Sequence, residues 1–150
     1  MDPLGVVEEF LREDEWEYDR REALPLIEVA IVGQHGRWTC FIQAPDGEDR
    51  VIIYGVLHLQ VPAARFGAMA EFVARANWGL PIGNFEFDFS EGELRFKTSA
   101  DIGATGWTIE LVKLLFYANG AATDRYLPGI EAVMNGEQTP EQAIVAIEGE

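Results

Sequence analysis

The feature that most constrains this chain is a stretch of alternating apolar and polar residues between residues 26 and 59, interrupted by two turn motifs. The β-rich runs are 26–32, 37–44 and 50–59. Gly33-Gln34-His35-Gly36 lies between the first two runs, and Pro45-Asp46-Gly47-Glu48 lies between the last two. Because Asp-Gly between alternating runs is a strong hairpin signal, the pattern predicts three consecutive antiparallel strands.

Two-residue turns in both motifs would fix the register of these strands. Phe41 would then face Glu28 on the first strand and Ile52 on the third, and Trp38 would face Gly55. Since side chains alternate along a strand, one face of the sheet becomes almost purely apolar. Its members are Ile27, Val29, Ile31, Trp38, Cys40, Ile42, Val51, Ile53 and Leu57. We expect this to be the core face, with the Trp38 indole covering the gap left by Gly55.

The opposite face of the same sheet is mixed. Polar residues there surround four large apolar side chains, Phe41, Ile52, Tyr54 and Val56. Either a helix of the same chain covers this face, or it is an ordinary partly apolar surface, or it is a patch for self-association or partner binding. The sequence leaves these alternatives open.

Two further strands, 84–89 and 93–99, flank a predicted turn at Glu91-Gly92. A two-residue turn there would place opposite charges opposite each other on one face and aromatic rings on the other. The pairs would be Asp88 with Arg95, Glu86 with Lys97, and Phe87 with Phe96.

The remaining segments have helical patterns. The first expected helix is capped by Asp2 and ends before Trp16, and the second runs from Pro62 to about Asn77. A third runs from Trp107 to Asn119, and Pro128 is expected to kink or restart the next helix. Thr139 and Gln142 begin a last helix with a capping box. Gly120 is expected to end the third of these. The sequence thus predicts an α+β domain with a mainly antiparallel five-stranded sheet and helices packed on one face, in the order α-βββ-α-ββ-α(α).

Length and charge restrict the class of protein further. A chain of 150 residues is expected to form one domain, 1–150, with a short C-terminal helix at 137–150. Its net charge of −15 disfavours nucleic acid and anionic membranes as partners. The longest uncharged run, 51–64, is too short to span a bilayer. One cysteine, Cys40, and an acidic start favour a cytoplasmic protein.

The negative charge is concentrated at the two ends. Residues 1–22 have a net charge of −6 and residues 126–150 of −5, whereas the region between them has only −4. Acidic ends of this kind either keep a protein soluble or attract a basic segment of a partner.

Residues for catalysis are scarce. Two histidines and two serines stand outside any nucleophile or zinc motif, so we expect no metal site, no cofactor and no catalytic residues. Glu86 and Asp88 could form an acid–base pair, but their expected partners would neutralise them. Cys40 is expected to be a small buried apolar residue. The glycine motifs Gly33–Gly36 and Gly103–Gly106 lack the basic residues and strand context of nucleic-acid or phosphate loops.

Several residues taken in order resemble the YbjN family of bacterial sensory transduction regulators. They are Gly36-Arg37-Trp38-Thr39-Cys40, Asn77-Trp78-Gly79-Leu80, Gly83, Phe85, Asp88, Gly92, Arg95, Tyr126, Pro128 and Ile130. The resemblance covers roughly residues 4 to 135 and implies a fold similar to the small acidic chaperones of type III secretion, which are commonly dimers. It implies a non-enzymatic regulator or chaperone-like protein and carries over no catalytic residues.

Two functions from different classes follow as hypotheses. The first is a protein-binding regulator, expected to be a homodimer, that uses Phe41, Ile52, Tyr54 and Val56 to bind a partner that could include a basic segment. The second is a small-ligand binding sensory module with a pocket near Trp78 and Trp107. An enzyme without a readable motif is a third reading, which the scarcity of His, Ser and Cys disfavours.

Overall fold

The structure of the chain, a computed structural model, describes residues 2–149. Within that range it holds one antiparallel sheet of six strands, in the order β1-β2-β3-β4-β6-β5. The strands are β1 (Asp19–Arg21), β2 (Leu26–Val32), β3 (Arg37–Gln43), β4 (Arg50–Leu57), β5 (Asn84–Phe87) and β6 (Leu94–Asp101). The helices are α1 (Pro3–Glu13), α2 (Phe66–Asn77), α3 (Ile109–Met134) and α4 (Pro140–Glu148), with single 3-10 turns at Ala63–Arg65 and Gly103–Thr105.

The sheet has one strand more than the five that the sequence predicts. The additional strand, β1, consists of Asp19, Arg20 and Arg21, all of them exposed. It has no alternation of apolar and polar residues, because neither of its faces enters the core, and for this reason the periodicity does not reveal it.

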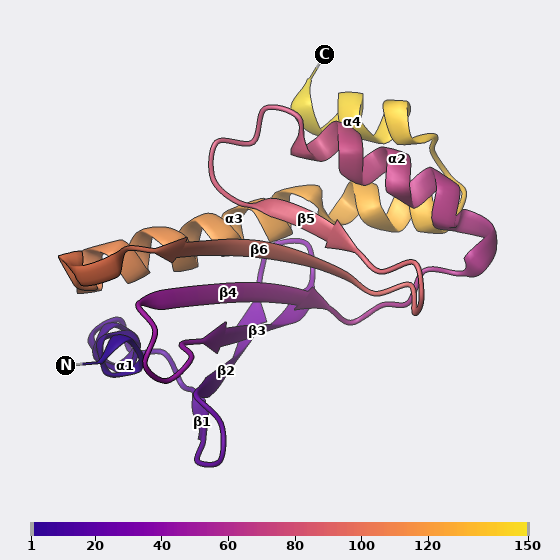
Figure 1. Cartoon of the computed structure of the whole chain (residues 1–150). Helices are drawn as coiled ribbons and strands as arrows, with labels where there is room; N and C mark the ends of the chain where they lie inside the picture. The colour runs from indigo at the N-terminus through magenta and orange to yellow at the C-terminus, as the bar shows by residue number, and fades with distance from the viewer. Residues whose placement is uncertain (1, 150) are drawn as a thin grey trace.

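All four helices lie on one side of the sheet (Figure 1). The long helix α3 runs along β6 and β4, and α1 packs on its N-terminal half, where the Phe10 and Phe116 rings meet edge to face at 5.2 Å. Helices α2 and α4 pack on each other and on the C-terminal half of α3, where Phe72 contacts Tyr126. The expectation that helices cover one face of an antiparallel sheet is confirmed.

The core face of the first three predicted strands is also confirmed. All nine of the apolar residues assigned to it from the alternation are buried. The hairpin of β2 and β3 has the predicted register, with Glu28 opposite Phe41, and the Gly33 amide donates to the Gly36 carbonyl at 2.8 Å.

The register predicted for β3 and β4 is wrong by two residues. Phe41 lies opposite Tyr54 rather than Ile52, and Trp38 lies opposite Leu57 rather than Gly55. The connection is longer than two residues because Pro45 has no amide hydrogen to continue the ladder, and the Glu48 amide instead closes a turn onto the Pro45 carbonyl. A shift of two leaves every side chain on its predicted face.

The register predicted for β5 and β6 is wrong in the same way. Glu86 lies opposite Arg95, and Phe85 rather than Phe87 lies opposite Phe96. The Asp88 amide donates to the Glu93 carbonyl at 2.9 Å, its carbonyl accepts from the Gly92 amide, and its carboxylate accepts from the Ser90 amide at 2.7 Å. The turn therefore takes four residues, and the predicted pair of Asp88 with Arg95 does not form.

The helix at the start, the helix after Pro62 and the capping box of Thr139 and Gln142 are confirmed. The prediction that Gly120 ends a helix is wrong, because α3 continues through Gly120 and Pro128 for 26 residues. One side of α3 is buried along most of this length, and this packing outweighs the weak helix propensity of glycine. Of the predicted helix 137–150, the structure forms Pro140–Glu148; Glu150 lies outside the described residues.

Candidate functional site

The open face of the sheet brings together the four apolar residues predicted for partner binding. Phe41 and Tyr54 are cross-strand partners, and Ile52 and Val56 lie two residues to either side of Tyr54 along β4. All four side chains are half-buried. Along β3 and β4 they alternate with the buried residues of the core face, so they lie on the other face of the sheet. The helices lie on the core side (Figure 1), and among residues 2–149 no helix covers the four residues. Whether they bind a partner remains a prediction.

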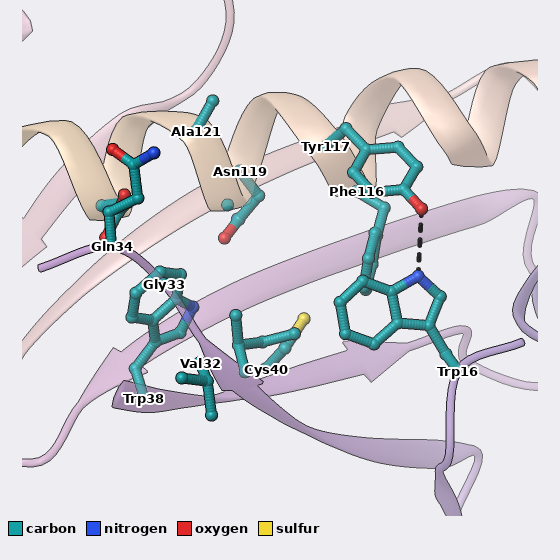
Figure 2. Close-up of a pocket in the computed structure, with 13 residues that line it drawn as sticks. Trp16, Val32, Gly33, Gln34, Trp38, Cys40, Phe116, Tyr117, Asn119 and Ala121 are labelled. Atoms are coloured by element: carbon teal, nitrogen blue, oxygen red, sulfur yellow. Dashed lines mark hydrogen bonds between the residues drawn. The ribbon is translucent and has the colours of Figure 1, made fainter. Parts of the chain in front are cut away.

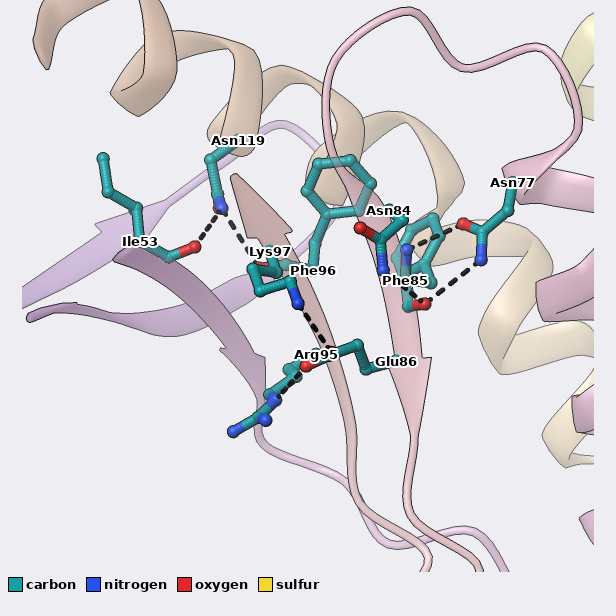
Figure 3. Close-up of polar contacts among 9 residues, drawn as sticks. All are labelled: Ile53, Asn77, Asn84, Phe85, Glu86, Arg95, Phe96, Lys97 and Asn119. Carbon is teal, nitrogen blue, oxygen red and sulfur yellow. Dashed lines mark hydrogen bonds and ion pairs between the residues drawn. The ribbon is translucent and has the colours of Figure 1, made fainter. Parts of the chain in front are cut away.

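A charged cluster borders this apolar patch on β5 and β6. Glu86 accepts from Arg95 Nε at 2.8 Å and pairs with Lys97 Nζ at 3.0 Å (Figure 3). The Arg95 guanidinium also lies 3.9 Å from the ring centre of Tyr54, a cation–π contact that joins the charged cluster to the patch. The open face therefore has an apolar centre and a polar border.

The pKa of Glu86 lies below its ordinary value. Partial burial would raise it, but hydrogen bonds and charge from Lys97 and Arg95 outweigh that effect. Glu86 is thus held ionised. Asp88, its predicted companion in an acid–base pair, is engaged in the turn instead.

The two tryptophans proposed for a ligand pocket have different surroundings. Trp78 follows α2 and is 87% exposed. Trp107 is buried, and its indole N–H donates to the Asp49 carbonyl at 2.8 Å, which holds the connection of β3 and β4 in place. A cavity elsewhere in the structure is lined by neither of them.

That cavity lies between α3 and the β2–β3 hairpin, with a volume of about 650 Å³ (Figure 2). Its lining comes from four separate parts of the sequence: Trp16, residues 31–34, residues 38 and 40, and residues 116–124. Sequence reasoning missed it, because only the tertiary packing of α3 brings these segments together. The one indication in the sequence is that three of these parts contain aromatic residues, namely Trp16, Trp38, and Phe116 with Tyr117.

Polar side chains of α3 enter the core beside this cavity. Asn119 donates through Nδ2 to the carbonyls of Ile53 at 3.0 Å and Phe96 at 3.1 Å (Figure 3). Thr123 is buried next to it, and Gly55 lies beneath both. The gap at Gly55 is therefore filled mainly by Asn119 and Thr123, with Trp38 at its side, rather than by the Trp38 indole as predicted.

Asn77 has a structural role at the end of α2. Its side-chain amide accepts from the Phe85 N–H at 2.7 Å and donates to the Phe85 carbonyl at 3.1 Å (Figure 3). This pair of bonds ties α2 to the outer edge of β5. These bonds give a physical reason for asparagine at the first position of Asn77-Trp78-Gly79-Leu80, because its side chain can both accept from and donate to one peptide group.

Cys40 has the inert character expected of it. Burial raises the pKa of its thiol to about 12, so that the thiolate needed for nucleophilic attack does not form near neutral pH. Among residues 2–149, His, Cys, Asp and Glu side chains form no group of three that could hold a metal ion. In the same range, no helix has both the length and the apolar character to cross a membrane.

The fold and the open face define a small α+β protein whose helices leave one side of an antiparallel sheet free. Residues 3–132 match the model of the YbjN family, described as "Putative bacterial sensory transduction regulator", and the chain belongs to this family. The matched region ends before α4.

Comparison with solved structures agrees on the fold. The crystal structure of YbjN, described as a "putative transcription regulator from E. coli", superposes with a TM-score of 0.63 at 10% identity, covering 88% of this chain and 89% of that one. A chain of the HopA1-SchA chaperone–effector complex superposes with a TM-score of 0.51 at 12% identity, with the same coverage. The chaperone-like fold is thus confirmed. No curated protein matches the sequence significantly.

Proposed function

We propose that this protein is a non-enzymatic regulatory or chaperone-like protein that binds a protein partner through the open face of its sheet, and that it is a homodimer. The observation that carries the proposal is the patch of Phe41, Ile52, Tyr54 and Val56 on the face of the sheet that none of the helices within residues 2–149 covers. The family description as a sensory transduction regulator supports it, as does the likeness in fold to a chain of a chaperone–effector complex.

The chemistry of the face suits protein binding. Burial of the apolar centre would supply affinity, at roughly 25 cal/mol per Å² of apolar surface removed from water. The Glu86, Arg95 and Lys97 cluster would form part of the polar border that protein interfaces have around their centre. With a net charge of −15, the chain would attract a partner that has a basic segment.

The test is the double variant Tyr54→Asp/Val56→Asp. Two carboxylates in the patch would have to be desolvated on binding, so we expect the variant to lose both the dimeric mass measured by light scattering and the capture of partners in a pull-down. Leu114→Asp is the matched control, because Leu114 is exposed on α3 on the other side of the molecule. A folded double variant that keeps its mass and its partners would refute the proposal, and a monomeric wild type would refute its dimeric part.

The second candidate is a small-ligand binding sensory module. The cavity between α3 and the β2–β3 hairpin favours it, in place of the predicted site near Trp78 and Trp107. A thermal-shift screen separates the two functions, since a specific small ligand raises the midpoint of unfolding by mass action.

A further inference from the structure

Strand β2 forms the edge of the sheet over the second half of its length. Its pairing with β1 ends where Asp19 lies opposite Glu28. Before Asp19 the chain leaves the edge, and the Trp16 ring packs on Phe116 of α3 with 5.2 Å between the ring centres. Within the part of the chain that the structure describes, no strand therefore lies beside residues 29–32 on the side away from β3.

The hydrogen bonds of the β2–β3 hairpin show which backbone groups point out of this edge. The Gly33 amide donates to the Gly36 carbonyl at 2.8 Å, and the Ala44 amide donates to the Pro25 carbonyl at 3.1 Å. In an antiparallel pair, residues that bond to the partner strand alternate with residues whose amide and carbonyl groups point away from it. The odd-numbered residues of β2 therefore bond to β3, and the even-numbered residues point outward.

Two of these outward-pointing residues lie past the end of β1. Leu26 and Glu28 face β1, whereas Ala30 and Val32 do not. Both are exposed, Val32 to 74%, and no hydrogen bond among residues 2–149 engages their outward amide and carbonyl groups. Unpaired groups in a row along a sheet edge are a template for one more strand. The chemistry of this edge thus matches an extended peptide backbone.

The cavity of about 650 Å³ lies beside the same edge. Ile31 and Trp38 on the sheet and Phe116 on α3 give it apolar walls. Val32 and Tyr117 are exposed members of its lining, so its mouth lies between the free edge of β2 and α3. Residues directly opposite each other on neighbouring strands have their side chains on the same face. A residue of an added strand opposite Ile31 would therefore direct its side chain into the cavity.

One end of the cavity has acidic neighbours. Figure 2 shows Trp16 with Tyr117 at one end of the cavity and Gln34 at the other. Glu15 and Glu17 lie on either side of Trp16 in the connection from α1 to β1, and both are exposed. Because this connection continues into β1, a strand beside residues 29–32 would meet it at one end. A basic residue of the added strand would be attracted there.

We propose that residues 29–32 of β2 bind an extended segment of another protein as an additional strand, with an apolar side chain in the cavity and a basic residue near Glu15 and Glu17. Hydrogen bonds to the backbone of Ala30 and Val32 would hold the segment, and the cavity would select its apolar side chain. The proposal does not rest on the open-face patch, so either surface can fail without the other.

The probe is the peptide acetyl-Lys-Thr-Phe-Thr-Lys-amide. Its two threonines can pair with Ala30 and Val32 while its phenylalanine lies opposite Ile31. Binding is followed by the amide signals of residues 29–32 in ¹H–¹⁵N NMR spectra, up to millimolar peptide. We expect saturable shifts of the Ala30 and Val32 amide signals, both in the wild type and in Tyr54→Asp/Val56→Asp.

Two control peptides separate the backbone contribution from that of the side chain. Methylation of both threonine nitrogens removes the donors that would face β2 and should abolish binding. Serine in place of phenylalanine should weaken binding about tenfold or more, as expected when a buried aromatic side chain is lost.

Val32→Pro tests the edge on the protein itself. It removes an outward amide hydrogen that the β2–β3 ladder does not use, at an edge position of the kind where sheets tolerate proline. Val32→Thr is the matched control, because it keeps the amide and the branched shape. We expect Val32→Pro to bind the peptide about three- to tenfold more weakly, the effect of one net hydrogen bond, and Val32→Thr to bind it like the wild type.

Gly120→Leu tests the cavity. Gly120 lines the cavity, and a Cβ there would meet no atom within 4 Å, so leucine would occupy the space intended for the phenylalanine. Gly67→Leu, at an exposed position of α2 with equally open space, is the control. We expect the preference for the phenylalanine peptide over the serine peptide to disappear in Gly120→Leu and to persist in Gly67→Leu.

Four outcomes would overturn the proposal. Absence of shifts at residues 29–32 would show that the edge takes no strand. Equal binding of the methylated peptide would exclude strand pairing and leave the cavity to a small apolar ligand. Equal binding of the serine peptide would show that the cavity is not used. Loss of peptide binding in Tyr54→Asp/Val56→Asp would place the peptide on the open face instead.

Discussion

Gly55 lies in the middle of β4, beneath Asn119 and Thr123 of α3. A Cβ there would lie 2.7 Å from Asn119 Oδ1 and 2.9 Å from Thr123 Oγ1. Neither side chain can move away freely, since Asn119 donates to two strand carbonyls and Thr123 donates to the carbonyl of Asn119 at 2.8 Å. The absence of a side chain at residue 55 thus allows a polar contact between helix and sheet inside the core.

Gly55→Ala is expected to destabilise the protein by about 1–3 kcal/mol, the usual effect of overpacking a core. The measurement is the free energy of unfolding in urea. Gly67→Ala is the control, because its Cβ would meet open space on α2, and it should be neutral or stabilising by up to about 1 kcal/mol. If Gly55→Ala were as stable as the wild type, the close approach of α3 would not depend on this glycine.

The sequence predicted the face on which each strand residue lies but not the polar groups of the core. Cys40 and Trp38 could be assigned to the core because alternation in a strand is regular. Asn119 and Thr123 could not, because their carbonyl and glycine neighbours belong to strands more than twenty residues away. Their burial is a product of tertiary packing.

Helix α3 contains a proline and still runs without interruption. Pro128 cannot donate to the carbonyl of Asp124, its partner position in an α-helix. The ring of His35 bonds that carbonyl at 2.9 Å, from the turn of the β2–β3 hairpin. With a carbonyl as acceptor, Nδ1 must be the nitrogen that donates. The hairpin thus satisfies the helix group that the proline leaves free.

His35→Ala is expected to cost about 0.5–1.5 kcal/mol, because the Asp124 carbonyl loses its partner. Pro128→Ala is expected to stabilise α3 by up to about 3 kcal/mol and to supply an amide hydrogen to the same carbonyl. In the Pro128→Ala background the cost of His35→Ala should therefore fall toward zero. A double-mutant cycle of unfolding free energies measures this coupling, and additive effects would contradict it.

Strands and helices were predicted correctly where their own residues have a strong alternation or capping pattern. Five strands and the helices at Asp2, Pro62 and Thr139 follow from alternation and capping. The two register errors arise from turns that recruit extra residues, at Pro45 and at Asp88. The break predicted at Gly120 fails because local propensity is weaker than the burial of the helix face.

At the scale of the whole molecule, the acidic residues near the N-terminus fall into two groups. Some terminal acids stabilise the fold: Glu8 pairs with Arg20 and accepts from Tyr18, and Asp14 accepts from Tyr117 at 2.8 Å. Others, such as Glu13, Glu15 and Glu17, are exposed, and no ion pair involves them within residues 2–149. The second group is the one available to attract a basic partner.

Replacing Glu13, Glu15 and Glu17 with glutamine is expected to change the unfolding free energy by less than about 0.5 kcal/mol. The same variant should bind a decalysine peptide more weakly at low salt and lose less affinity as NaCl is added, because fewer charges remain to be screened. Titrations by fluorescence at several salt concentrations check this.

The control for charge location replaces Asp46, Glu91 and Glu93 of the balanced middle region by their amides. We expect a smaller change in salt dependence than for the N-terminal variant. Equal changes in the two variants would indicate that net charge alone, rather than its concentration at the ends, governs attraction.

Of the two candidate sites, the open face could be predicted from the sequence. The four residues of the open face lie together as the alternation indicated, because a register shift of two conserves the faces. The cavity was not, since Trp16, Trp38 and Asp124 converge only when α3 crosses the hairpin. A site on one face of a regular sheet can be predicted from the alternation of residues along its strands, whereas a site formed where separate elements meet cannot.

The amide of Asn77 has a consequence for assembly. It occupies both backbone groups that Phe85 would otherwise offer on the outer edge of β5. An incoming strand would have to displace the end of α2 before it could hydrogen-bond there. The sheet is thus terminated by a side chain that imitates a peptide group, and fibril-like growth from this edge is blocked while association through the face is left open.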